Sequence, residues 1–513
     1  MEKGEQLSGR RSRNAICNMY RKYQDVILVL GINLVILLIF WGGLLHNQYN
    51  ADTIYYLFQS PKDAYMFRLE EGRFVLAFLY WFLPSIGINV ASRISVTTFF
   101  NLLMFAIAIT INYFALVEDK KLDYLKLLCV DLVCINVFFA ELLMFAETLF
   151  GVAYIFAALA VWCYWKKKHI GFVLSVLLAV STYQYTAIYI AIILLFVVGF
   201  RFAFRICKES VRESFLITVF CILAGVLNVV CIRLLGRVGI LPADEVQKES
   251  EMGGDLAEKI ASAFLDTVDI LRDCKELLMG QWIFLLVSAL IGFCIIGLCM
   301  QCRDWNRLGY FGLLFVVTFG LRLVIPCTRV EFDNPPRFAF SYFLVQGLFL
   351  LTVLYLLNHY ENKLSPVKIE WGKRLVKGVV ILYVMVQLLS VQNIVINKYA
   401  SKAIDETFVR LMYQRVQEYE TETGITVTKF ASVNDVSIRE AYEEVGATAY
   451  SVNERVLGKA TWSIVQAVTE REFERVPMDQ EVYEKYFAGK NWDYLNLDEQ
   501  LVILDDTAYW CIY

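Results

Sequence analysis

Apolar runs of about twenty residues recur along most of the chain, separated by short polar or basic segments. A helix of that length crosses the roughly 30 Å hydrocarbon core of a bilayer. The first run, VILVLGINLVILLIFWGGLL, is too long for a signal peptide and lacks a small-residue cleavage site, which predicts a retained anchor. We expect eleven spans, at residues 26–46, 95–117, 124–142, 147–165, 170–182, 185–200, 214–235, 282–300, 308–326, 338–357 and 377–396.

The basic residues between the runs predict how the chain threads through the membrane. Segment 1–24 is rich in Lys and Arg, and such segments stay in the cytoplasm. The run 74–90 is interrupted by a proline, a glycine and an asparagine. If it crossed, every later short basic loop would face outward, so we predict that it does not cross. The chain is then a multi-pass protein of the cytoplasmic membrane with its N-terminus inside, and its first loop, 47–94, and its C-terminus outside.

From about residue 400 the pattern becomes that of a soluble domain. Apolar positions with helical spacing stop at Gly424, and ITVTKF alternates like a strand. Residues 459–488 hold two short helical patterns, and LVILDDTAYWCIY predicts one or two strands around an Asp-Asp turn. The plainest interpretation is a packing or recognition module. The fold class predicted is an all-α polytopic membrane bundle with a small C-terminal α/β domain, divided as 1–24, 25–398 and 399–513.

Composition narrows the class of protein. Hydrophobic residues make up 58% of the chain, charged residues only 19%, and the mean hydropathy is +0.52, which excludes a string of soluble domains. A net charge of −3 without a basic domain argues against a nucleic-acid partner. Most of the 13 cysteines lie in apolar runs, and no zinc-ligand pattern is complete. No cofactor is predicted, and a divalent cation is left open without support.

Under this threading, the polar residues that are costly at membrane depth concentrate on the outer side. An ionisable group there is by default a functional site or an ion pair. The candidates are Asp52, Arg68 and Arg73 in the first outer loop, Glu141 and Glu147 at the outer ends of spans three and four, Tyr183 and Gln184 between spans five and six, Arg322 near the end of span nine, and Arg337 beyond it.

The chemistry that fits this set is sugar transfer from a lipid-linked phosphate donor. A polyprenyl phosphate leaves readily at neutral pH, so it needs cations rather than a general acid, and arginine binds phosphate bidentately. The acceptor hydroxyl needs a base, which a single carboxylate such as Asp52 can supply. With base and leaving group on opposite faces of the sugar, the displacement inverts the anomeric carbon.

Each candidate also has a plainer interpretation. Asp52 would be only the N-cap of a helix beginning at Thr53. The two arginines of the loop would snorkel from an interfacial helix. The two glutamates at the outer ends of spans three and four would pair with arginines between helices, while Glu70 and Glu71 would form a solvated face.

Four segments resemble a known family: ADTIYY, RLEEGRFVLAFLYWFLP, NVFFAELLMFAETLF and LAVSTYQYTAIYIAIILL. Their order and spacing, over roughly residues 25–400, resemble the Gtr family (GtrII type) of O-antigen-modifying glucosyltransferases, which are bacterial membrane enzymes of GT-C-like architecture. Where the family has paired aspartates and Gly-Arg-Trp, this chain has Ala51-Asp52 and Gly72-Arg73-Phe74. The family's Asn-Pro-Phe…Glu and Tyr-Gln elements appear as Asn136-Val-Phe-Phe…Glu141 and Tyr183-Gln184.

The resemblance implies glucose transfer from undecaprenyl-phosphate-glucose to a cell-surface glycan outside the cytoplasmic membrane. The partners implied are that lipid-linked donor, the glycan acceptor and the bilayer, with a donor synthase and a flippase as further candidates. Two other classes stay open at this point. A transporter or flippase of lipid-linked saccharides would carry inverted repeats and discontinuous helices near the midplane. A non-catalytic envelope assembly protein would use the C-terminal domain as its working part.

Overall fold

The structure is a computed structural model of the 513-residue chain. It gives the backbone alone at residues 281, 323–328 and 336–338. It describes residues 24–46, 50–90, 92–117, 122–241, 257–262, 264–265, 281–328, 336–434, 456–490, 492 and 495–512. The predicted basic N-terminus, 1–24, therefore falls almost entirely outside the described residues.

Six helices within the described residues are long and apolar enough to cross a membrane, which confirms a polytopic helical class. They are the helix Gln24–Leu45, whose last turn is η1 (Gly42–Leu45), α5 (Ile94–Leu116), α11 (Lys208–Arg237), α14 (Gln281–Gln301), α16 (Pro336–His359) and α17 (Pro366–Thr423). A further long helix, α15 (Trp305–Thr328), lies between α14 and α16 in the sequence. The total of eleven spans stays a prediction.

Shorter apolar helices complete the bundle: α4 (Phe74–Ser85), α8 (Phe150–Trp165), α9 (His169–Thr182) and α10 (Thr186–Arg201). The side chains of α10 are buried from its first residue to Gly199, so this helix lies at the centre of the bundle. With 12 residues, α4 is only about 18 Å long, shorter than the hydrocarbon core. The other three short helices, of 14 to 16 residues, are also shorter than the core, so whether run 74–90 crosses stays a prediction.

One predicted span is wrong. Residues 124–142 do not form a single helix: α6 (Tyr124–Asp131) is short, and the chain continues through η2 (Val137–Phe139), α7 (Ala140–Met144) and η3 (Ala146–Thr148). Val133 and Ile135, just before Asn136, are β-branched and favour helix poorly, and the Asn136 amide donates to the carbonyls of Leu132 and Val133, both at 2.9 Å. Irregular backbone is tolerated at this depth because protein surrounds it.

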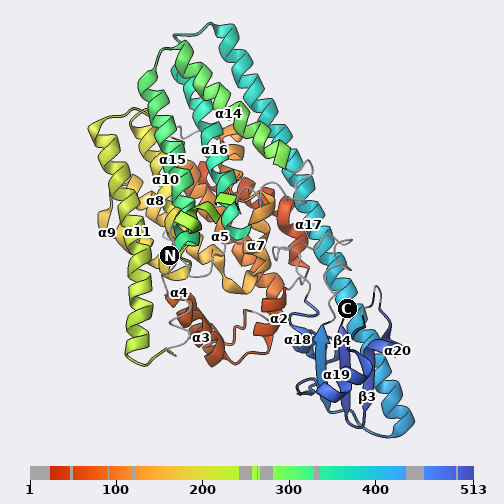
Figure 1. Cartoon of the computed structure of the whole chain (residues 1–513). Coiled ribbons are helices and arrows are strands. Elements are labelled where there is room, and N and C mark those ends of the chain that lie inside the picture. The colour runs from red at the N-terminus through yellow and green to blue at the C-terminus, as the bar shows by residue number, and fades with distance from the viewer. Residues whose placement is uncertain are drawn as a thin grey trace, which may run out of the picture.

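The helices are connected at two opposite ends (Figure 1). At one end, the backbone N–H of Ile206 donates to Asn306 at 2.7 Å, and Arg307 donates to the hydroxyl of Tyr360 at 3.1 Å. These bonds tie together the basic turns after α10, α14 and α16. The other end carries α2 (Ala51–Leu57), α3 (Pro61–Glu70) and the C-terminal strands. The predicted threading requires this separation, and the orientation in the membrane stays a prediction.

The C-terminal part forms a small mixed sheet. Its strands are β1 (Lys429–Asn434), β2 (Glu474–Arg475), β3 (Leu501–Leu504) and β4 (Thr507–Ile512). Their order is β2-β1-β4-β3, with β1 parallel to both neighbours and β3 antiparallel to β4. The helices beside them are α18 (Thr461–Thr469), α19 (Gln480–Tyr486) and α20 (Leu497–Gln500). The two short helices and the last hairpin are confirmed, whereas the first strand begins later than ITVTKF predicts.

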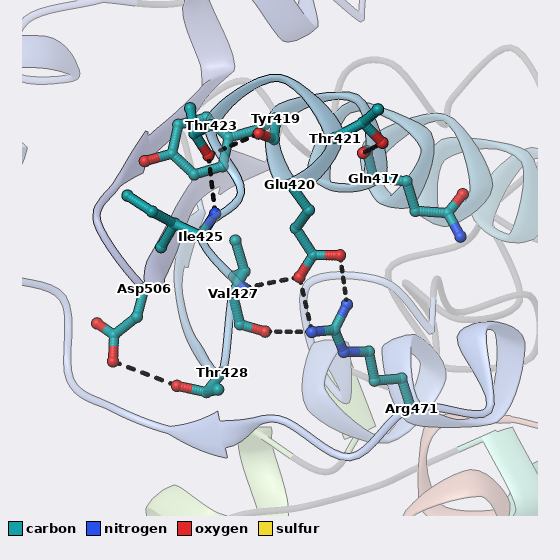
Figure 2. A network of polar contacts seen from close by, with 10 residues as sticks. All are labelled: Gln417, Tyr419, Glu420, Thr421, Thr423, Ile425, Val427, Thr428, Arg471 and Asp506. Atoms are coloured by element: carbon teal, nitrogen blue, oxygen red, sulfur yellow. Dashed lines mark hydrogen bonds and ion pairs between the residues drawn. The ribbon is translucent and has the colours of Figure 1, made fainter.

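A single helix joins this sheet to the bundle. α17 runs for 58 residues, so the last predicted span and the predicted soluble helix are continuous, and it ends before Gly424 as predicted. Near its end, Glu420 accepts two hydrogen bonds from the guanidinium of Arg471, which also donates to the carbonyl of Val427 (Figure 2). These donors hold the pKa of Glu420 below its usual value, and the pair fastens the helix end to the sheet.

Candidate functional site

Asp52 lies in the first turn of α2 and is half-buried. The N-cap of this helix is Asn50, whose side-chain oxygen accepts from the backbone N–H of Thr53 at 2.7 Å. The interpretation of Asp52 as the cap is therefore wrong. The Asn50 amide also donates to the carbonyl of Met144 at 3.1 Å, which fixes the start of α2 on the bundle. Asp52 itself makes no hydrogen bond with a described residue, so its carboxylate is available to another group.

Glu147 is fully buried in η3 and holds α2 from the bundle side. The hydroxyl of Thr53 donates to Glu147 Oε2 at 2.6 Å, and the Tyr80 hydroxyl donates to the Glu147 carbonyl at 2.7 Å. The other carboxylate oxygen, Oε1, has no hydrogen-bond partner in the described part of the chain. Glu147 thus lies near Asp52, because it is hydrogen-bonded to Thr53, the next residue in the chain.

Arg68 and Arg73 share one carboxylate. Arg68 donates to Glu71 Oε2 at 2.9 Å, and Arg73 reaches Glu71 Oε1 at 3.1 Å. The Arg68 side chain is only 2% exposed and that of Glu71 20%. The interpretations of a snorkelling Arg68 and a solvated Glu71 are therefore wrong.

Aromatic rings enclose the Arg68 guanidinium. Its central carbon lies 4.6 Å from the ring centroid of Tyr56 and 5.4 Å from those of Phe67 and Tyr80. Burial opposes the charge, but the carboxylate of Glu71 raises the pKa of Arg68 above its usual value, so the group stays charged. Its Nε and Nη2 are buried without an acceptor among the described residues, and such unmet donors are costly.

Tyr56 is the side chain on which several of the charged candidates act. Burial raises the pKa of Tyr56, and the charges of Arg68, Glu71, Asp52 and Glu147 all act on it. Of these four groups, only Arg68 lies directly over the ring, and electrostatic effects fall off with distance, so the three carboxyl groups lie within interaction range of this side chain. Sequence reasoning predicted three of the four as site residues and missed the part played by Glu71.

The turn that carries Arg73 is held by the turn between α9 and α10 and by α11. The Gln184 amide donates to the Glu71 carbonyl at 2.6 Å, and the Asn228 amide, from α11, donates to the Gly72 carbonyl at 2.9 Å. The Arg73 guanidinium lies 5.8 Å from the ring centroid of Tyr183. Tyr183 and Gln184 thus contact the first loop. The only signal for Asn228 was an amide inside an apolar run.

We expect Gly72→Ala to reduce at least tenfold the glucose transfer that the resemblance implies. Gly72 has φ +71°, and an added Cβ would lie 2.4 Å from Ile232 Cδ1 and 2.7 Å from Asn228 Oδ1, so the turn must move. Gly87→Ala is the matched control, because Gly87 has φ +76° but open space around it. Transfer rates of both variants in membranes, at equal expression, provide the measurement. Equal rates in the two variants would show that the contacts of Gln184 and Asn228 with this turn do not affect transfer.

The remaining candidates lie deeper or beyond the described part. Glu141 is fully buried in α7. Arg322, also buried, lies over the ring of Tyr342 and forms a side-chain hydrogen bond with Tyr185. Arg337 lies in α16, but its side chain is outside the described residues.

Tyr185 connects the two arginine regions. Its ring centroid lies 6.3 Å from that of Tyr183, which faces Arg73, and its hydroxyl shares a 2.9 Å hydrogen bond with Ser341. Arg322 is therefore joined to the first-loop cluster through two adjacent tyrosine rings. Among the described residues, no group of three or more His, Cys, Asp or Glu side chains could hold a metal ion, so no metal ligands are assigned.

Comparison with known proteins gives one match. The family model described as Glucosyl transferase GtrII matches residues 42–352, more than half of the chain. The matched range contains Asp52, Glu147 and the four candidate arginines, Arg68, Arg73, Arg322 and Arg337. Searches of the curated proteins and of the solved structures find no significant match. The family match confirms the resemblance found in the sequence and argues against a transporter or a non-catalytic assembly protein. This chain belongs to the Glucosyl transferase GtrII family.

Proposed function

We propose that this glucosyltransferase takes glucose from a polyprenyl-phosphate donor and transfers it to a cell-surface glycan on the outer side of the cytoplasmic membrane. Asp52 removes the proton from the acceptor hydroxyl as its oxygen attacks the anomeric carbon. The bond from that carbon to the phosphate oxygen breaks, and the polyprenyl phosphate leaves as an anion. Attack opposite the leaving group inverts the anomeric configuration.

The observation that carries this proposal is that Arg68 is buried with two N–H groups that have no acceptor among the described residues. A charged guanidinium, 2% exposed, keeps two buried N–H donors without an acceptor among the described residues. A phosphate oxygen of the donor would satisfy them, and arginine presents paired donors that match phosphate. Arg73, which shares Glu71 with Arg68, would bind the same phosphate from the other side. Arg322 and Arg337 would complete the binding of the donor.

A lipid-linked donor fits the helix that follows Arg73. α4 exposes large aromatic side chains, with Phe78 54% and Trp81 62% exposed, and the rings of Phe78 and Phe82 stack. A contiguous exposed apolar surface marks contact with a membrane or a ligand. Since Arg73 is the N-cap residue of α4, this surface begins beside the proposed phosphate site. An isoprenoid chain can lie along this apolar surface, whereas a sugar nucleotide has no apolar chain to place there.

The two glutamates take different parts in this proposal. Glu147 holds α2 through Thr53 and places a second carboxyl group near Asp52. Glu141 lies on a separate short helix of the same irregular segment, and we retain it as a candidate for orienting the sugar. Tyr183 and Gln184 support the turn that carries Arg73.

The donor class is tested with the purified chain in liposomes that hold no donor synthase. Labelled glucose should reach the surface glycan from polyprenyl-phosphate-glucose and not from a nucleotide-linked glucose. Transfer from the nucleotide donor at a comparable rate would contradict the proposal. Glycan analysis of host cells with and without the gene then identifies the acceptor and the linkage.

A further inference from the structure

The helix that carries Asp52 is packed between two parts of the molecule. On the bundle side, Asn50 and Thr53 hydrogen-bond to Met144 and Glu147. On the other side, Ile54, which is 2% exposed, belongs to the hydrophobic core of the C-terminal part. α18 packs against α2 there (Figure 1), so the C-terminal part touches the proposed active site directly.

The two contacts of α2 with the C-terminal part and with the charged cluster lie on opposite faces. Successive helical residues are rotated by about 100°, so Ile54 lies about 200° around the helix from Asp52. Tyr56, four residues after Asp52, shares the Asp52 face and contacts Arg68. Burying Ile54 in the C-terminal core therefore turns Asp52 toward the arginine cluster.

The surface that receives Ile54 is itself fixed to the bundle. Asp405 of α17 is fully buried, and its Oδ2 accepts the backbone N–H groups of Val456 and Leu457, each at 2.9 Å. These two residues lie just before α18 in the sequence and belong to the same hydrophobic core as Ile54. Charge-assisted bonds to backbone donors are among the stronger ones.

The same long helix also fixes the chain before α2. The Gln392 amide donates to the carbonyls of Ile39 and Phe40 at 3.1 and 3.0 Å, and the Tyr399 hydroxyl donates to the carbonyl of Gly43. α17 thus anchors the helix that precedes α2 and, through Asp405, the surface behind α2.

We propose that the C-terminal part is a clamp on α2 and that Ile54 is a positioning residue, which holds Asp52 in place to take the proton of the acceptor hydroxyl. The proposal rests on the role of Asp52 given above and adds a catalytic part for the C-terminal domain, beyond packing or recognition. A displacement of a reacting group by about 1 Å can lower the rate about a hundredfold. Loss of the clamp is therefore expected to lower kcat.

The test uses four full-length variants: Ile54→Ala, Ile54→Val, Asp52→Asn and Val416→Ala. Val416 is a matched control, since it is fully buried in the same core but about 16 Å further along α17 than Asp405. Hydrogen exchange of the amides in 51–57 measures the clamp, and kcat with the donor KM measures its effect on catalysis.

For Ile54→Ala we expect at least tenfold faster exchange in α2 and a 10- to 100-fold lower kcat, with the donor KM nearly unchanged. Ile54→Val should restore most of both, and Val416→Ala should change neither. Unchanged exchange in α2, or faster exchange with wild-type kcat, would overturn the proposal. Asp52→Asn should lose activity with normal exchange. If that variant stays active, the assignment of the base fails, while the exchange result still decides whether the clamp exists.

Discussion

Replacing Asp52 with Asn should lower kcat for glucose transfer by about 10² to 10⁴, the range that a positioned general base contributes. The amide is nearly the same size as the carboxylate but cannot accept the proton of the acceptor hydroxyl. Because Asn50 caps α2 and Thr53 and Ile54 hold it, the variant should fold normally and keep its donor KM. Rates with saturating lipid-linked donor in membranes provide the measurement.

Asp63→Asn is the matched control for this result. Asp63 lies in the same predicted outer loop, is exposed, and accepts a hydrogen bond from the Ser60 hydroxyl at 2.7 Å, which an amide oxygen can also accept. The control should retain full activity. Undiminished transfer by Asp52→Asn would remove Asp52 from the role of base, and equal losses in both variants would point to a general effect of charge in the loop.

Replacing Arg68 with Lys should raise the donor KM by at least tenfold and leave the acceptor KM within about twofold. Lysine keeps the charge and can still pair with Glu71, but it lacks the planar set of donors that binds phosphate bidentately. Hydrogen bonds between charged groups contribute about 1.5–3 kcal/mol each, which corresponds to roughly tenfold or more in affinity. Initial rates at varied donor and varied acceptor concentrations separate the two constants.

Arg93→Lys controls for this substitution, because Arg93 is an exposed arginine within the same predicted outer loop. Its donor KM should match that of the unaltered chain. A rise in the acceptor KM as large as that in the donor KM would show that Arg68 does not bind the donor phosphate.

The sequence by itself determined the class of this protein and the order of its parts. The length and composition of the apolar runs predict membrane helices, and α17 ends before Gly424 as predicted. The last hairpin, β3 and β4 around Asp505, was also predicted correctly. These features depend on local periodicity, capping residues and turn residues. All of these signals lie within a short stretch of sequence, so they can be recognised without the fold.

The tertiary structure alone decided how the candidate site is assembled. The chain after α6 leaves the helical path because distant groups, such as the Trp41 indole bonded to the Cys134 carbonyl, satisfy its backbone. Glu71 joins two arginines rather than facing water, and Asn228 holds a turn 156 positions earlier in the chain. Ile54 looks like any apolar residue until the C-terminal core covers it. Contacts between residues so far apart leave no periodic trace in a single sequence, so only the fold reveals them.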